Sequence, residues 1–389
     1  MGPAALSPLG VGFLAVLVVT GWSGLTLVLS PCLALALIPQ RDIARVVDPV
    51  YRRVTHFVQW AWMGNVAVLL EWLYGVRIHV TGDAATAAKG SMLLTGERAL
   101  WIANHRTRID WMLLWCLAIR THSLAQLKIV LKAPLRNVPI FGWAMQHFLF
   151  IFLHRKWADD EVMLKTYLPF LADKEPQASY LLFPEGTDLS DGNREKSIAF
   201  AEKQGLPARQ YSLYPRTTGW CFMTPILRRS VDAVYDITMF FVDHVQGERP
   251  SEQALLSGRM PRAIHFHVER LDIATLPQEK EELAAWLEER FKQKEAWLKA
   301  FYEQDGKLPD GAVPIAELDQ HSSDSKATFV LVVAFWLVFV VFAVRMAWAF
   351  GIWSILFSVF VFGGHIALTH FGKGVDGHLH HKALTSGRS

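Results

Sequence analysis

Two residues able to move a proton, His105 and Asp110, lie five positions apart in "NHRTRIDW", which runs from Asn104 to Trp111. Apolar residues precede and follow this stretch, so the polar cluster lies where a buried strand meets a buried helix. A carboxylate beside an imidazole fixes the ring tautomer and stabilises the imidazolium that forms on protonation. The pair therefore predicts a general base for an alcohol, worth roughly 10²–10⁴ in rate.

The spacing restricts how the two side chains can meet. On a continuous helix five residues turn about 500°, which leaves the side chains about 140° apart. We therefore expect His105 in a turn and Asp110 in the first helical turn, where a carboxylate also suits the positive helix end. Arg106 and Arg108 can hold an anionic substrate group. A His–Asp pair that merely caps the helix is the alternative.

Two more stretches place polar residues after strands. "LLFPEGTD" ends at Asp188. Glu185 and Thr187 can bind hydroxyl or phosphate oxygens directly or by ordering basic neighbours, and Gly186 permits a tight turn or close backbone approach. In a third stretch, Lys132, Arg136 and Arg155 are candidate phosphate ligands. The alternatives are a plain strand-to-loop turn and ordinary surface charges.

The composition indicates a membrane protein. The chain has 389 residues, of which 52% are hydrophobic and 19% charged, against about 25% charged in an average domain. A net charge of +3 gives no reason to expect nucleic-acid binding. The three cysteines are far apart and predict neither a disulfide framework nor a metal site. His265 and His267 share a strand face without a third ligand, so no metal is predicted.

Residues 1–40 carry no charged side chain and are long enough for a membrane segment, which needs about 20 apolar residues. A cleaved signal peptide is the alternative, but no basic region opens it. Residues 41–76 form a basic flank and a Trp-rich helix, lying either in the headgroup layer or buried in the protein. Four arginines follow the apolar segment and predict a cytosolic flank: Arg41, Arg45, Arg52 and Arg53.

Residues 327–371 predict C-terminal membrane helices. Two apolar runs, Ala327–Val344 and Met346–Leu368, are separated by Arg345. They either cross the membrane twice or form a hairpin that enters and leaves on one face. Residues 306–326 are predicted to be a linker, and residues 372–389 a solvated tail that contains several histidines.

Residues 77–305 predict a single α/β domain, because short apolar runs alternate with longer helical patterns. Such alternation favours a mainly parallel sheet covered by helices, with ligands at the carboxyl ends of the strands. The predicted strands are Val76–Val80, Leu100–Ala103, Lys128–Leu131, Leu149–Leu153, Tyr180–Phe183, Val234–Phe241 and Ala263–Val268. The predicted helices are Asp110–Ile119, Asp159–Ala172, Arg194–Gln204 and Lys280–Tyr302.

Four ordered blocks, "NHRTRID", "FGWAMQHFLFIFLHRKW", "FPEGTD" and "LYPRTTGW", resemble those of the glycerolipid acyltransferases, membrane enzymes that acylate lysophospholipids. Within that family the blocks are most similar to the lysocardiolipin-acylating branch. The resemblance covers roughly residues 98–302. The second block departs from the more widespread pattern, which opens with a glycine, because Leu149 stands at that position.

The resemblance implies acyl transfer from acyl-CoA, a co-substrate, to a lysophospholipid hydroxyl, with no cofactor and no metal. By similarity His105 is the base and Asp110 its partner. The acceptor is implied to be monolysocardiolipin or a related anionic lysophospholipid, with lysophosphatidate as the alternative. The implied acceptor and acyl-binding residues are Lys132, Arg155, Glu185, Gly186, Thr187, Pro215 and Arg216.

The resemblance also implies a place in the cell and a set of partners. The catalytic domain is expected on the cytosolic side of the endoplasmic reticulum, with the mitochondria-associated membrane as the alternative. The expected partners are acyl-CoA, lysophospholipid and the bilayer. Other classes of function are a transacylase that uses a phospholipid donor, a catalytically silent membrane protein and a transporter.

Overall fold

The computed structural model describes residues 6–38, 41–318 and 322–386, and for 41–45, 323, 324 and 386 it describes the backbone alone. The side chains of Arg41 and Arg45, which belong to the predicted basic flank, therefore lie outside the described part.

An eight-stranded sheet forms the centre of the domain, in the order β4-β3-β5-β2-β6-β7-β1-β8. Five of its seven strand pairings are parallel, and the antiparallel ones are β6 with β7 and β1 with β8. The predicted mainly parallel sheet is thus confirmed. The strands are β1 Arg77–Gly82, β2 Ala99–Ala103, β3 Leu127–Lys132, β4 Ile151–Leu153, β5 Ser179–Leu182, β6 Ala233–Val242, β7 Ala263–Asp272 and β8 Val313–Pro314.

The pleat of β2 shows how the sheet separates two apolar layers. Leu100 and Ile102 pack on the side of three helices: α9 (Trp157–Lys174), α11 (Thr217–Leu227) and α13 (Lys280–Glu303). Trp101 and Ala103 pack on the other side, with α3 (Arg41–Val68) and α7 (Trp115–Arg120). The domain helices are α4 Ala84–Ala87, α5 Gly90–Leu93, α6 Asp110–Leu113, α7 Trp115–Arg120, α8 Phe141–His147, α9 Trp157–Lys174, α10 Asp191–Lys203, α11 Thr217–Leu227, α12 Glu252–Leu256 and α13 Lys280–Glu303. The 3₁₀ turns are η3 Ala133–Asn137, η4 Ile273–Thr275 and η5 Ala316–Leu318.

Two boundaries inside this domain differ from the prediction. The helix predicted over Asp110–Ile119 is two short helices, α6 and α7, that meet at Leu114. The predicted linker, 306–326, contains β8, which pairs with β1 and so belongs to the sheet. A two-residue strand carries too little periodicity to be found from the sequence.

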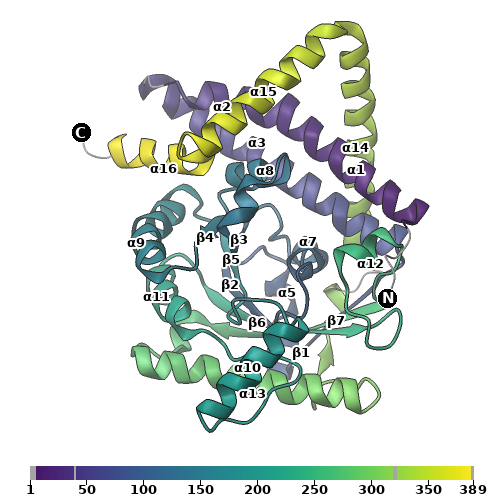
Figure 1. Cartoon of the computed structure of the whole chain (residues 1–389), viewed down its shortest axis with the longest axis vertical. Helices are drawn as coiled ribbons and strands as arrows, with labels where there is room; N and C mark the ends of the chain where they lie inside the picture. Colours follow the sequence, from purple (N-terminus) through teal and green to yellow (C-terminus); the bar gives the residue numbers. More distant parts are fainter. Residues whose placement is uncertain (1–5, 39–40, 319–321, 387–389) are drawn as a thin grey trace.

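The apolar N-terminal segment consists of α1 Pro8–Gly24, a π-helical turn η1 Leu25–Leu29 and α2 Ser30–Ala36. It is followed by α3 Arg41–Val68 and a second π-helical turn, η2 Leu69–Leu73. Together with α14 Ser323–Phe350 and α15 Ile352–His370, these helices lie on the side of the sheet opposite α13 (Figure 1). Pro8–Ala36, Ser325–Phe350 and Ile352–His370 are each long and apolar enough to cross a membrane.

The helix α3 is buried on one face, as the second of the two predicted alternatives required. Met63 and Val66 of α3, and Leu70 of the following turn η2, are fully buried in the apolar layer that covers one face of the sheet. The charged Glu71 is paired with Arg120 at 2.6 and 2.7 Å. The inner face of this segment is therefore packed against the domain, while Phe57 and Trp72 of the same segment are exposed.

One residue of the predicted basic flank, Arg52, turns inward. It binds the buried Glu175 at 2.5 Å, and Lys128 of β3 reaches the same carboxylate at 3.0 Å. Burial alone would raise the pKa of Glu175, but Lys128 and Arg52 hold it well below its ordinary value. The ion cluster joins α3 to the sheet.

The C-terminal helices also depart from the prediction. The helix α14 continues through Arg345, and the break comes at Gly351, which adopts φ +50°. The prediction of a solvated tail is wrong: residues Gly374–Ser386 form α16, which packs against the catalytic domain beside α8 and α9 (Figure 1). Lys382 of α16 binds Asp48 of α3 at 3.0 Å, and Val375 is buried.

Candidate active site

The two residues singled out by their spacing, His105 and Asp110, are in contact. Nδ1 of His105 lies 3.1 Å from Oδ2 of Asp110. His105 follows β2 in a turn and Asp110 is the first residue of α6, which is the arrangement predicted from the helical geometry. The fully buried Asp110 also accepts two hydrogen bonds from Thr107, from its backbone nitrogen and its hydroxyl, both at 2.8 Å.

This arrangement fixes the chemistry of the imidazole. A carboxylate at Nδ1 requires a proton on that nitrogen, so Nε2 of the neutral ring is free to accept one. The ring stacks on Phe183, with 4.3 Å between centroids, and its side chain is 15% exposed. Within the residues that the structure describes, Nε2 has no hydrogen-bond partner. The opening at Nε2 can therefore receive a hydroxyl.

The third sequence block holds the first through the backbone. Oε1 of Glu185 accepts a hydrogen bond from the backbone nitrogen of His105 at 2.7 Å, and Oε2 accepts one from Leu213, also at 2.7 Å. The backbone nitrogen of Leu189 donates to the carbonyl of His105 at 2.8 Å. Glu185 is buried and both of its carboxylate oxygens accept backbone N–H groups, so it positions the catalytic turn.

The loop after Glu185 is shaped by Gly186. Gly186 adopts φ +72°, and a Cβ atom added to Gly186 would lie 3.0 Å from Cδ of Arg216. The backbone nitrogen of Arg216 donates to the carbonyl of Pro184 at 2.8 Å, and its side chain is exposed. Thr187 is occupied within the loop, because its hydroxyl accepts from Asn193 at 2.9 Å. Of this group, Arg216 is thus the one best placed to meet an anion.

The two arginines of the first block have different surroundings. Arg106 binds Asp243 with both terminal nitrogens, at 2.6 and 3.0 Å, and its guanidinium lies 4.7 Å from the ring centroid of Tyr302. This buried pair ties the catalytic turn to the end of β6, so the prediction that Arg106 holds substrate is not supported by its contacts. Arg108 is exposed and lies 3.7 Å from Glu252.

Lys132 and Arg155 lie at the same edge of the sheet as His105, because each follows the carboxyl end of a parallel strand. Both are exposed. With strands about 4.8 Å apart, β3 and β4 lie about 10 and 14 Å from β2. Pro215 is half-buried beside Arg216. The structure brings these residues to one edge but not into contact with His105.

The backbone at the position of the missing glycine in the second block has a conformation that is typical of glycine. Leu149 occupies that position with φ +56°, a left-handed conformation that glycine adopts freely and that costs other residues roughly 1–2 kcal/mol. This position therefore has a backbone conformation suited to glycine, and the buried Leu149 side chain packs in the apolar layer with α9 and α11. Arg155 is also left-handed, with φ +63°.

Three contributors to the site were not found from the sequence: Thr107, Phe183 and Leu189. Thr107 is three residues from Asp110, a spacing at which threonine and aspartate often form local hydrogen bonds. This contact could therefore have been predicted from the sequence. Phe183 and Leu189 act through stacking and the backbone, which leave no signature in residue type.

Comparison with known proteins decides the family. Residues 77–235 match the family model described as Acyltransferase, and residues 254–336 match the one described as Acyltransferase C-terminus. The chain is 42% identical over 301 residues to "Lysocardiolipin acyltransferase 1" of Danio rerio, covering 77% of this chain and 72% of that protein. The chain belongs to the acyltransferase family.

This chain is similar to two further curated proteins. "Lysocardiolipin acyltransferase 1" of Gallus gallus is 42% identical over 255 residues, covering 65% of each chain. "1-acyl-sn-glycerol-3-phosphate acyltransferase delta" of Homo sapiens is 29% identical over 261 residues, covering 67% of each. Among the residues that the structure describes, three helices are long and apolar enough to cross a membrane, so this acyltransferase is an integral membrane protein.

Proposed function

We propose that the protein transfers an acyl chain from acyl-CoA to the hydroxyl of an anionic lysophospholipid, releasing CoA. One observation carries the proposal: His105 is fixed at Nδ1 by buried Asp110 and is open at Nε2. A base held in this way suits deprotonation of an alcohol at neutral pH.

The reaction proceeds in two steps. His105 Nε2 takes the proton of the acceptor hydroxyl while the oxygen attacks the thioester carbonyl, forming a tetrahedral intermediate and an imidazolium that Asp110 stabilises. The carbon–sulfur bond then breaks, and the imidazolium returns the proton to the leaving thiolate. No acyl-enzyme is required. Cys116 is buried, and burial raises the pKa of its thiol, so it is a poor nucleophile.

We propose monolysocardiolipin or a related anionic lysophospholipid as the acceptor, and lysophosphatidate as the second candidate. Exposed cations at the carboxyl edge of the sheet, among them Lys132, Arg155 and Arg216, suit a phosphate-bearing headgroup. The preference for monolysocardiolipin rests on the names of the two relatives with 42% identity.

We place the catalytic domain on the cytosolic face of the endoplasmic reticulum, where water-soluble CoA and a lysolipid in the bilayer can meet. The mitochondria-associated membrane is the second candidate. The cationic flank after Pro8–Ala36 supports the cytosolic side through the positive-inside rule.

An assay with defined substrates tests the acceptor. The purified full chain is incubated with radiolabelled oleoyl-CoA and a panel of monolysocardiolipin, lysophosphatidate and lysophosphatidylinositol. Label in cardiolipin supports the proposal, whereas label in phosphatidate alone overturns the preferred acceptor. A parallel arm with labelled phosphatidylcholine as the acyl donor and no acyl-CoA identifies a transacylase, which would overturn the proposed donor.

A further inference from the structure

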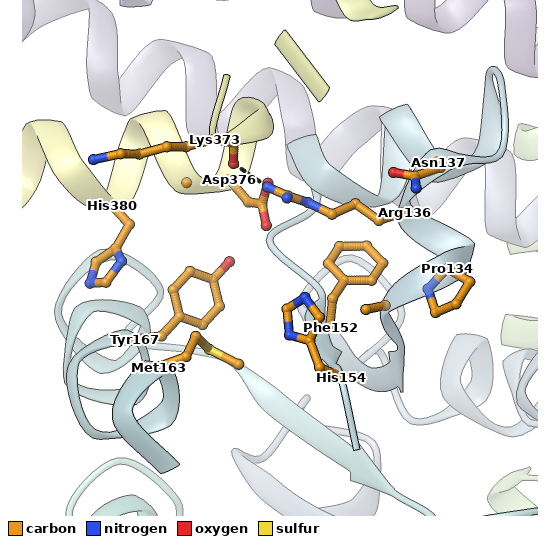
Figure 2. Close-up of a pocket in the computed structure, with 12 residues that line it drawn as sticks. Pro134, Arg136, Asn137, Phe152, His154, Met163, Tyr167, Lys373, Asp376 and His380 are labelled. Carbon is orange, nitrogen blue, oxygen red and sulfur yellow. Dashed lines mark hydrogen bonds and ion pairs between the residues drawn. The ribbon is translucent and has the colours of Figure 1, made fainter. Parts of the chain in front are cut away.

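A cavity of about 620 Å³ lies where the C-terminal helix α16 meets the catalytic domain. Its walls come from η3 and β4 on one side and from α9 and α16 on the other, and Figure 2 shows side chains from all four projecting into it. The cavity is built at the carboxyl edge of the sheet, beyond the strands nearest His105. It is therefore separate from the catalytic turn.

Several buried polar atoms that line the cavity have no hydrogen-bond partner among the described residues. The hydroxyl of Tyr167 is buried without a hydrogen bond in the described structure, and the side chain is 5% exposed. Figure 2 shows this hydroxyl directed into the cavity. Burial raises the pKa of Tyr167 well above its ordinary value, so the group is a hydrogen-bond donor. Nε2 of His380 and Nε of Arg136 are also buried without a partner among the described residues.

The charges of the cavity favour an anion. Arg136 binds Asp376, the carboxylate in the lining, and also the carbonyl of Lys373. Asp376 is thereby compensated, and the exposed ammonium of Lys373 supplies the excess positive charge. Apolar side chains complete the lining: Phe152 of β4, Met163 of α9 and Pro134 of η3. A phosphate ester attached to an apolar body matches this mixture of cationic and apolar groups.

The position of Lys373 relative to the membrane helix α15 indicates that the phosphate belongs to a bilayer lipid. The apolar helix α15 ends at His370, and Lys373 follows three residues later. A helix of this kind ends where hydrocarbon meets water, so Lys373 lies at the level of the lipid headgroups. The cavity opens where phosphodiesters of the bilayer are most concentrated.

We propose that this cavity binds the phosphate headgroup of an anionic bilayer phospholipid and so fastens α16 to the catalytic domain. The phosphate accepts a hydrogen bond from Tyr167 and one from Lys373, whose exposed side chain turns toward the cavity from the direction drawn in Figure 2. The glycerol backbone lies against Phe152 and Met163. The site does not depend on which lysolipid is acylated at His105.

Native mass spectrometry of the full chain in neutral detergent tests this site without acyl-CoA. We expect dioleoylphosphatidylglycerol to be retained at least about 10-fold more than dioleoylphosphatidylcholine. Lys373→Gln should reduce that retention about 10-fold and Tyr167→Phe several-fold, as expected for one charged and one neutral hydrogen bond. Both changes are mild, because Lys373 is exposed and phenylalanine keeps the ring.

The controls separate this site from catalysis. Lys165→Gln, which removes an exposed charge on α9 outside the cavity, should retain phosphatidylglycerol as the wild type does. His105→Ala should also retain it, even though transfer is lost. Equal retention by Lys373→Gln, Tyr167→Phe and wild type would overturn the site. Displacement of the lipid by equimolar inorganic phosphate or CoA would overturn a lipid source.

Discussion

Oε1 of Glu185 lies 2.7 Å from the backbone nitrogen of His105, and this contact joins two sequence blocks 80 residues apart. The second carboxylate oxygen holds the backbone of Leu213 in the same way. Glu185 thus sets the position of the catalytic turn relative to the loop that carries Arg216.

Glu185→Gln should lower kcat by roughly 100-fold with little change in the KM for acyl-CoA. A glutamine has one acceptor oxygen, so one of the two backbone N–H groups loses its partner, and a displacement of about 1 Å at the base has an effect of that size. The control is Glu202→Gln, an exposed position on α10. Steady-state kinetics that show equal kcat for Glu185→Gln and wild type would contradict the positioning role.

The carboxyl group of Glu185 should also make the thermal stability of the protein depend on pH. Burial raises the pKa of Glu185 from 4.5 to about 7. The folded state binds the proton of Glu185 more tightly than the unfolded state does. Protonation of Glu185 therefore contributes to the free energy of unfolding in full below about pH 4.5, and this contribution is lost as the pH rises through about 7. The thermal midpoint of the wild type should therefore fall relative to that of Glu185→Gln between pH 5 and 8. A difference that does not change over this range would contradict the raised pKa.

Thr107→Val should lower kcat by roughly 10-fold. The change keeps the side-chain shape but removes the hydroxyl that donates to Oδ1 of Asp110, and loss of a group that orients a ligating or catalytic side chain typically has an effect of this order. Thr166→Val, on the exposed face of α9, serves as the control. If both variants turn over as the wild type does, Thr107 does not orient the carboxylate.

Arg106 and Arg108 should respond differently to mutation. Arg106→Met leaves Asp243 as an unpaired buried charge, so we expect a loss of about 3–5 kcal/mol in the free energy of unfolding. Arg108→Gln should leave the thermal midpoint unchanged and raise the KM for the anionic lysolipid. Unfolding curves and acceptor titrations check both, and an unchanged midpoint for Arg106→Met would refute the structural role of its ion pair.

The sequence predicted the layers of this fold well, because the strands are buried on both faces and read as short apolar runs between turns. It also predicted the meeting of His105 with Asp110, since the helical geometry allowed one arrangement. It did not show how Glu185 and Arg106 are used, because a charged residue after a strand looks the same whether its partner is a substrate or a backbone amide. Only tertiary contact distinguishes these cases.

The segments outside the sheet were harder to predict. The tail helix α16 carries only a narrow apolar stripe, Val375, Leu379 and Ala383, among several histidines, and the prediction of a solvated tail overlooked that stripe. The break between α14 and α15 was expected at the charged Arg345, yet an arginine can be accommodated on an exposed helix face. Gly351 ends the helix because glycine tolerates φ +50°.

The most direct test of the account is acyl transfer by His105→Ala. Purified variant and wild type, matched for membrane insertion and thermal midpoint, are compared with oleoyl-CoA and monolysocardiolipin. We predict that kcat falls by at least about 100-fold, since the general base is removed while the fold is kept. Equal rates of cardiolipin formation by the two proteins would contradict the assignment of His105 as the base.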